Sequence, residues 1–211
     1  MSCDETISPA ERRRLRVRQA ILDAAERVFA EDGEAGLSIR RLADEIDYSP
    51  GAIYKYFQSK QELVDELKES FFARILEQVE DVPEDTGPFL DYSRRCIETY
   101  IRTALERPHH YAAAFSGESE LIDGHTIDDA SNKRRAFKIL QDMVARGVAK
   151  GAFRADLNIG DASKSLWASA HGLAGLLSHM PHLPGPFLDN PGSNLDGLIS
   201  AHADFTIRGL M

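Results

Sequence analysis

The segment from Leu37 to Phe57 contains side chains that can read the edges of DNA bases. Tyr54 offers an aromatic ring and a hydroxyl group, and Lys55 offers a cation for a phosphate or a guanine edge. Gly51 and Ala52 lie just before them, and a bulkier residue at either position would hold a helix away from the bases. This set of side chains favours a short helix that enters a major groove.

Two short helices joined by a tight corner would position these side chains. Ser38 is predicted to cap the first helix, whose apolar residues recur at helical spacing on one face: Ile39, Leu42, Ala43 and Ile46. Asp47-Tyr48 would form the corner, and Ser49-Pro50 would start the second helix, because Ser caps a helix and Pro suits its first turn. Ile53 and Phe57 are four residues apart and would both face inward. The run from Ile53 to Phe57 also has strand propensity, so a β-strand is the alternative.

The overall charge of the chain is unusual for a protein that binds DNA. The formal net charge is −9, so a surface that binds phosphate has to be local. Two groups of cations fit this requirement: Arg12, Arg13, Arg14, Arg16 and Arg18 near the N-terminus, and Arg40, Arg41, Lys55 and Lys60 around the corner. The N-terminal group fits equally a grip on DNA phosphates and a solvated helix face.

The ordered series of residues around the corner resembles the DNA-binding domain of the TetR (tetracycline repressor) family of bacterial transcription regulators. The resemblance runs from Arg12 to about Leu76, through Ile21 to Ala25 with Phe29 and Gly33, Ser38 to Ala43, Ser49 to Phe57, and Ser59 to Leu63. It implies DNA contact by Arg40, Ser49, Gly51, Ala52, Tyr54, Lys55, Tyr56 and Lys60, and Ser38 and Pro50 complete the predicted set. Arg40 and Lys55 are expected to reach bases, and the others mainly to position the backbone.

The chain as a whole is predicted to be all-α, with about nine helices in two domains. A helix-turn-helix DNA-binding domain is expected over 11–80, with the helix-turn-helix itself at 38–57, and an effector-binding and dimerisation domain over 81–211. The acidic, Pro- and Gly-containing segment 81–88 marks this boundary, unless it falls within the helix before it.

Local signals place the individual helices. Residues 1–10 are expected to be a frayed tail, and a first helix from residue 11 should end at Gly33. A capping box of Ser59 and Glu62 should open a long helix to about residue 80. Further helices are expected at 88–106, 109–115, about 128–150, 161–179 and 194–208.

The second domain is expected to bind a small-molecule effector that changes the affinity for DNA. Residues predicted to line its pocket are Phe71, Tyr92, Cys96, Tyr100, Phe115, Phe137, Met143, Trp167 and His171. Such a wall favours an apolar or aromatic effector, although each of these side chains could instead be ordinary core. A ligand would tilt the connecting helix and alter the spacing of two recognition helices, if its affinity differs between the two states.

A homodimer that reads a palindromic operator in double-stranded DNA is the expected assembly, because one recognition helix reads too few base pairs. The last two helices would form the interface, since small residues recur in 161–179 and let another helix approach closely; these residues could also serve packing within one chain. The series Trp167 to Gly172, with Pro108, Tyr111, Phe115 and Gly151-Ala152-Phe153, resembles one subgroup of TetR-family C-terminal domains.

The sequence also has to be compared with two other classes of function. A metal- or redox-responsive regulator could use His109, His110, His171, the pair His179 and His182, and the thiol of Cys96. An enzyme is not expected, because the chain lacks a P-loop, a dinucleotide fingerprint and a nucleophile elbow. No cofactor, bound metal or membrane association is expected. Two distant cysteines and a polar N-terminus favour a reducing, cytoplasmic location.

Overall fold

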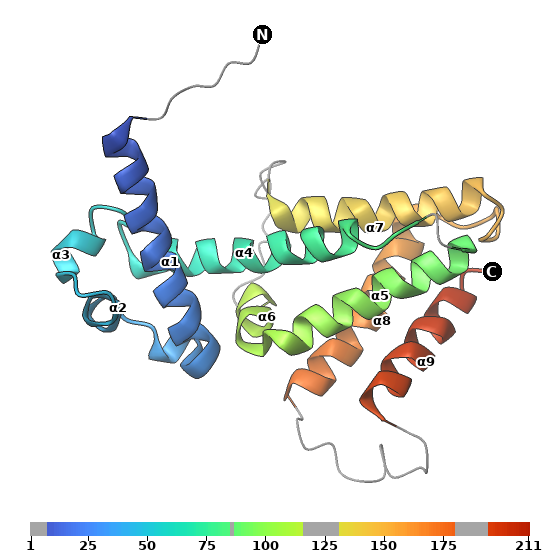
Figure 1. The fold of residues 1–211 in the computed structure, drawn as a ribbon. Coiled ribbons are helices and arrows are strands. Elements are labelled where there is room, and N and C mark those ends of the chain that lie inside the picture. The colour runs from blue at the N-terminus through green and yellow to red at the C-terminus, as the bar shows by residue number, and fades with distance from the viewer. Residues whose placement is uncertain (1–7, 85–86, 116–130, 180–193) are drawn as a thin grey trace. The chain divides into compact units, whose positions relative to one another are not determined.

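The computed structural model describes residues 8–84, 87–115, 131–179 and 194–211. Within these ranges every regular element is an α-helix, which confirms the predicted all-α class (Figure 1). The chain divides by its internal packing into two units, Met1–Lys68 and Glu69–Met211, so the dividing point lies inside α4 (Lys60–Glu80). The assignment of a DNA-binding domain to 11–80 and of an effector-binding and dimerisation domain to 81–211 stays a prediction.

The helix α1 (Pro9–Gly36) begins earlier than the sequence pattern predicts. The Ser8 hydroxyl accepts a hydrogen bond from the backbone N–H of Glu11 at 3.2 Å, and the Glu11 carboxylate accepts one from the N–H of Ser8 at 3.0 Å. This reciprocal capping box starts the helix at Pro9, so the expectation of a frayed tail up to Ala10 is wrong for residues 8–10. The predicted stop is present as a break at Gly33, where φ is 65°, before one further turn.

The first unit consists of α1 and three further segments that share one core. Its core includes the buried face of α1 and the inward face of α2 (Ile39–Glu45), and α3 (Pro50–Ile53) and the start of α4 complete it. Fully buried members from these elements are Ile21, Phe29, Leu42, Ile53, Phe57 and Leu63. The hydroxyl of Ser59 accepts from the N–H of Glu62 as predicted, but the Glu62 carboxylate accepts from Gln58 rather than from Ser59.

The second unit is a bundle of helices around one apolar core. It contains α5 (Phe89–Glu106), α6 (Pro108–Phe115), α7 (Asn132–Ala149), α8 (Ile159–His179) and α9 (Leu195–Arg208), close to the predicted ranges where the structure describes them. The start of the predicted helix at 128–130 lies outside the described residues. Helix α5 packs against both α8 and α9, and α7 packs against α8 (Figure 1).

The end of α7 requires glycine at two positions, one for close packing and one for its backbone conformation. A Cβ atom at Gly147 would lie 2.1 Å from the ring of Phe153, which is itself buried. Gly151 has a φ of 69° and follows the end of the helix, close to the predicted helix end at about residue 150. The chain therefore turns back at this point onto the core of the second unit.

His110 in α6 is the buried titratable residue that should make folding of the second unit sensitive to acid. Its side chain is 1% exposed, and burial, followed by the charges of Arg107 and His109, lowers its pKa to about 4. Between pH 6.5 and 4 the unfolded chain therefore binds a proton that the folded chain does not, so the free energy of unfolding falls as the pH falls.

The variant His110→Gln is expected to show a shallower decrease of the unfolding free energy between pH 6.5 and 4 than the parent protein. Urea unfolding at a series of pH values measures this slope. His109→Gln is the matched control: His109 is exposed, and its charge is only the last of the three causes of the low pKa of His110, so its substitution should change the slope much less than His110→Gln does. A parental slope in His110→Gln would contradict the assignment.

Candidate DNA-reading surface and effector cavity

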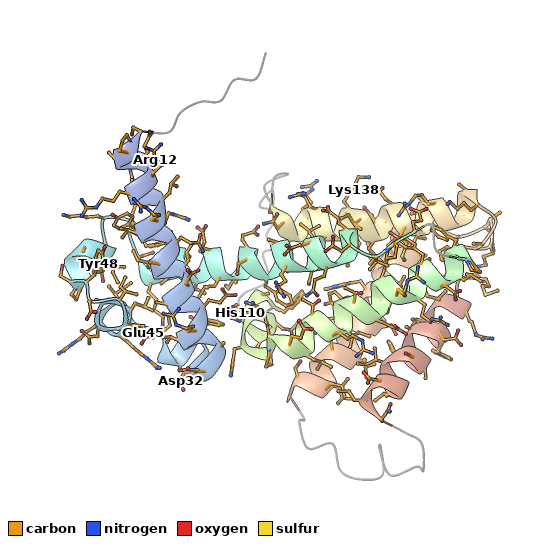
Figure 2. The ribbon with its side chains drawn as sticks, viewed as in Figure 1. Arg12, Asp32, Glu45, Tyr48, His110 and Lys138 are labelled. Carbon is orange, nitrogen blue, oxygen red and sulfur yellow. The ribbon has the colours of Figure 1, made fainter. Side chains whose placement is uncertain are left out.

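A serine caps the N-terminus of each of the two helices that meet at the corner, α2 and α3. The Ser38 hydroxyl accepts from the N–H of Arg41 at 3.1 Å, and the Ser49 hydroxyl accepts from the N–H of Ala52 at 3.2 Å. Between them Asp47 has a φ of 55°, and the exposed ring of Tyr48 marks the corner in Figure 2. Both predicted caps are therefore confirmed.

Helical hydrogen bonds continue beyond the short helix α3. The N–H of Tyr54 donates to the carbonyl of Pro50 at 3.2 Å, and the N–H of Phe57 donates to the carbonyl of Ile53 at 3.1 Å. A β-strand over this run, the alternative from the sequence, is thereby ruled out. The helical hydrogen bonds therefore extend about one turn beyond the end of α3.

Ile53 and Phe57 fix which side of this segment faces outward. Both side chains are 0% exposed, as predicted, whereas Tyr54 is 53% exposed and Lys55 is also exposed. A Cβ atom at Gly51 would meet no atom within 4 Å. Packing of the first unit therefore does not require a small residue at this position.

The predicted DNA-binding residues differ in their present partners. Arg40 and Lys55 are exposed and form no ion pair with any described residue, whereas the Lys60 ammonium donates to the carbonyl of Glu34 at 2.9 Å. Arg41, the neighbour of Arg40, pairs with Asp32 at 2.5 Å. The remaining members of the set are exposed (Ser38, Ser49 and Pro50) or half-buried (Ala52 and Tyr56).

The arginines at the start of α1 do not share one role. Arg18 pairs with Glu66 at 2.6 Å, and its guanidinium lies 4.9 Å from the centre of the Phe57 ring. Arg13, Arg14 and Arg16 are exposed on the same helix. Arg18 therefore joins α1 to α4 within the first unit, and the other side chains remain available to solvent or phosphate.

A cavity of about 450 Å³ lies within the second unit. Helices α4 to α8 supply its wall, which is almost entirely apolar. The wall consists of Phe72, Ile75, Val79, Tyr92, Cys96, Ile97, Tyr100, Phe115, Lys133, Arg134, Ala136, Phe137, Ile139, Leu140, Met143, Lys164, Trp167 and Ala170. Its size and composition are typical of a site for a small molecule.

Most of the predicted pocket residues meet in this cavity, and two do not. Tyr92, Cys96, Tyr100, Phe115, Phe137, Met143 and Trp167 line it. Phe71 and His171 lie outside the wall: Phe71 is 1% exposed and packs edge-on against Tyr111, and His171 stacks on Trp167 with ring centres 5.1 Å apart. Phe72, the next residue on α4, lines the cavity in place of Phe71.

The tyrosine hydroxyls of the wall are already hydrogen-bonded within the protein. The Tyr100 hydroxyl lies 3.2 Å from Nδ1 of His171, and the Tyr92 hydroxyl accepts from Arg146 at 3.1 Å. The hydroxyl of Tyr111 lies 2.7 Å from the same Nδ1 and donates to the His171 carbonyl. Burial raises the pKa of Tyr100 and lowers that of His171, which favours the neutral form of both side chains.

The metal- or redox-responsive alternative gains no support from the described part of the chain. No group of three or more His, Cys, Asp or Glu side chains there could hold a metal ion; His182 lies outside the described ranges. Burial raises the pKa of the Cys96 thiol, which disfavours the reactive thiolate. None of the described helices is long and apolar enough to cross a membrane.

Comparison with known proteins gives the class of this protein. The family described as "Bacterial regulatory proteins, tetR family" matches residues 21–67, and the "Tetracyclin repressor-like, C-terminal domain" matches residues 93–195. The transcriptional repressor AcnR of Corynebacterium efficiens is 41% identical over 148 residues, which cover 67% of this chain and 71% of AcnR. The chain therefore belongs to the TetR family of helix-turn-helix transcription regulators.

One further relative and one solved structure are similar to this chain. The transcriptional repressor KstR2 of Mycobacterium tuberculosis is 27% identical over 146 residues, covering 67% of this chain and 72% of KstR2. The fold also matches that of the regulator FadR of Bacillus subtilis in complex with stearoyl-CoA, with a TM-score of 0.69 and 17% identity over 92% of this chain and 99% of FadR. The protein is a DNA-binding transcriptional repressor that responds to an effector, and it is not an enzyme.

Removal of Arg18 is expected to lower stability rather than to act through DNA alone. Arg18→Ala should reduce the unfolding free energy by about 0.5–1 kcal/mol, since it loses a partly exposed ion pair and a cation–π contact. Arg14→Ala, on the same helix, should leave stability unchanged. Thermal or urea unfolding measures both variants; equal stability of Arg18→Ala and the parent would contradict the structural role.

Proposed function

We propose that α3 and the turn after it read operator DNA in the major groove, with Tyr54 and Lys55 at the bases. The observation that carries this proposal is the outward orientation of these two side chains, opposite the fully buried Ile53 and Phe57. Gly51 supports it, because the space beside this residue is open and would let the backbone approach a base edge. Arg40 would add a second cation for bases.

The other predicted residues would position the protein on the phosphates. Ser38 and Ser49 lie at helix N-termini, where hydroxyl groups and backbone N–H groups suit an anion. Pro50, Ala52 and Tyr56 would line the approach of the backbone. The Lys60 ammonium would have to leave the Glu34 carbonyl before it could bind a phosphate oxygen. Of the proposed DNA contacts, this one therefore requires the largest change of hydrogen-bond partner.

We also propose that two copies pair through α8 and α9 to read a palindrome, with half-sites one helical turn, about 34 Å, apart. Both helices carry apolar residues that one subunit leaves exposed: Leu176 is 40% exposed and Phe205 is 77% exposed. Ala168 and Gly172 precede Leu176 at intervals of one turn and are exposed too. An isologous pair would bury this surface in a bundle of four helices.

The cavity of the second unit is the proposed effector site. Helix α4 contributes Phe72, Ile75 and Val79 to its wall and Leu63 and Val64 to the core of the first unit. A ligand that moves α4 would therefore displace the reading helix and release the operator, with a coupling of about 1–3 kcal/mol. The Trp167 to Gly172 series, whose Trp167 and His171 rings stack on each other, supports membership of the subgroup of TetR-family C-terminal domains that this series resembles.

Lys55→Ala and Tyr54→Ala are each expected to weaken specific operator binding while the protein stays folded. Fluorescence anisotropy on a duplex selected in vitro from random sequences measures the affinity, and Lys138→Ala, in α7, is the control. Each contact to a base is worth about 1–3 kcal/mol, so the affinity should fall roughly 5- to 150-fold per variant. Unchanged affinity of both variants would refute the placement of the reading surface.

Phe205→Glu is expected to convert the protein from a dimer to a monomer, because it places a charge in the proposed interface. Sedimentation velocity measures the mass in solution. Leu15→Glu is the matched control: Leu15 is also apolar and 54% exposed, but it lies in α1. A parent protein that sediments as a monomer, or a Phe205→Glu variant that remains a dimer, would contradict pairing through this surface.

A further inference from the structure

We infer that the effector is an amphiphile, with an apolar body inside the cavity and an anionic group held by cations of its wall. This inference rests on the proposed effector site and adds the chemical class of its ligand. The charged residues of the wall carry it: Lys133, Arg134 and Lys164 line the cavity, and among the residues that the structure describes no Asp or Glu does. The whole chain has a net charge of −9, whereas the charged side chains of this wall are all positive.

The position of these cations suits an anion at the edge of the cavity. Lys133 and Arg134 stand in the first turn of α7, directly after the cap Ser131, where the helix dipole adds a partial positive charge. Lys133 is half-buried and forms no ion pair with a described residue. Lys164 lies 3.6 Å from Asp161, whose side chain is 75% exposed, so its charge is only weakly compensated.

The neutral polar groups of the wall are less suited to recognise a ligand. The Tyr92 and Tyr100 hydroxyls already bond to Arg146 and His171, and the Cys96 thiol is a weak donor. An uncharged polar ligand would therefore find few partners deep in the cavity. The cations of the wall would repel a cationic ligand. A ligand with an anionic group on an apolar chain would match both the cations and the apolar side chains of the wall.

The volume limits the size of the apolar body. At roughly 30 Å³ for each non-hydrogen atom, a cavity of about 450 Å³ holds about 15 such atoms. A saturated chain of a dozen carbons with one carboxylate matches this size. Dodecanoate and dodecanol are therefore a matched pair of probes that differ in the charge of one end.

Trp167 provides the readout, because it lines the cavity and is the single tryptophan of the sequence. We expect dodecanoate to shift its emission and to bind about tenfold more tightly than dodecanol, in fluorescence titrations checked by calorimetry. Two variants should weaken the binding of dodecanoate and leave the affinity for dodecanol unchanged. They are the double variant Lys133→Gln with Arg134→Gln and the single variant Lys164→Gln. Lys138→Gln is the control, because Lys138 projects from the same helix outside the cavity wall and pairs with Asp142 (Figure 2).

The outcomes separate this inference from the proposal on which it rests. If both probes bind with equal affinity, or if no variant reduces the preference for dodecanoate, the anionic class is wrong and the effector cavity stands. If neither probe shifts the emission of Trp167 or binds in calorimetry, the cavity is not an effector site for such ligands and both fail. A preference for dodecanoate that the lysine and arginine variants reduce, and Lys138→Gln does not, supports the inference.

Discussion

The burial of Ile53 and Phe57 is the constraint on which the DNA-reading surface depends. Both side chains are fully enclosed in the core of the first unit and are four residues apart on one helical turn. Once they face inward, Tyr54 and Lys55 have to face outward. The serine caps at Ser38 and Ser49 fix where each helix begins, and so fix this register along the chain.

Helix α4 links this surface to the second unit through continuous backbone. Its first turns are buried in the core of the first unit, and Phe72, Ile75 and Val79 line the cavity. In the proposed mechanism the effector acts on the helix that already holds the reading surface, and no separate relay is needed. The response then depends on how differently the ligand binds the two positions of α4.

The signals that the sequence contains locally were sufficient for much of the fold. Ser38, Ser49 and Gly151 were predictable because a cap or a left-handed stop depends on a few neighbouring residues. The start of α1 was missed, although Ser8 and Glu11 form a capping box, because the polar tail before them suggested fraying. A contact between residues far apart in the chain leaves no such local signal. The hydrogen bond from Lys60 to the Glu34 carbonyl could therefore not be predicted from the sequence.

The effector cavity shows the same limit more clearly. Aromatic residues of the second unit were expected to line it, and most do, but Phe71 and Phe72 exchange roles because they are neighbours on a helix and point in different directions. The cations Lys133, Arg134 and Lys164 were missed, since a charge on an amphipathic helix usually faces solvent. Only the packing of α7 and α8 around one space shows that they share a wall.

The most direct test of the central claim is a crystal structure of the protein bound to an operator duplex selected in vitro. The account predicts two subunits on successive major-groove faces, with Gly51 close to the bases and with Tyr54 and Lys55 at base edges. A complex in which α3 faces solvent while other residues hold the DNA, or in which Ile53 and Phe57 leave the core to reach it, would contradict the account.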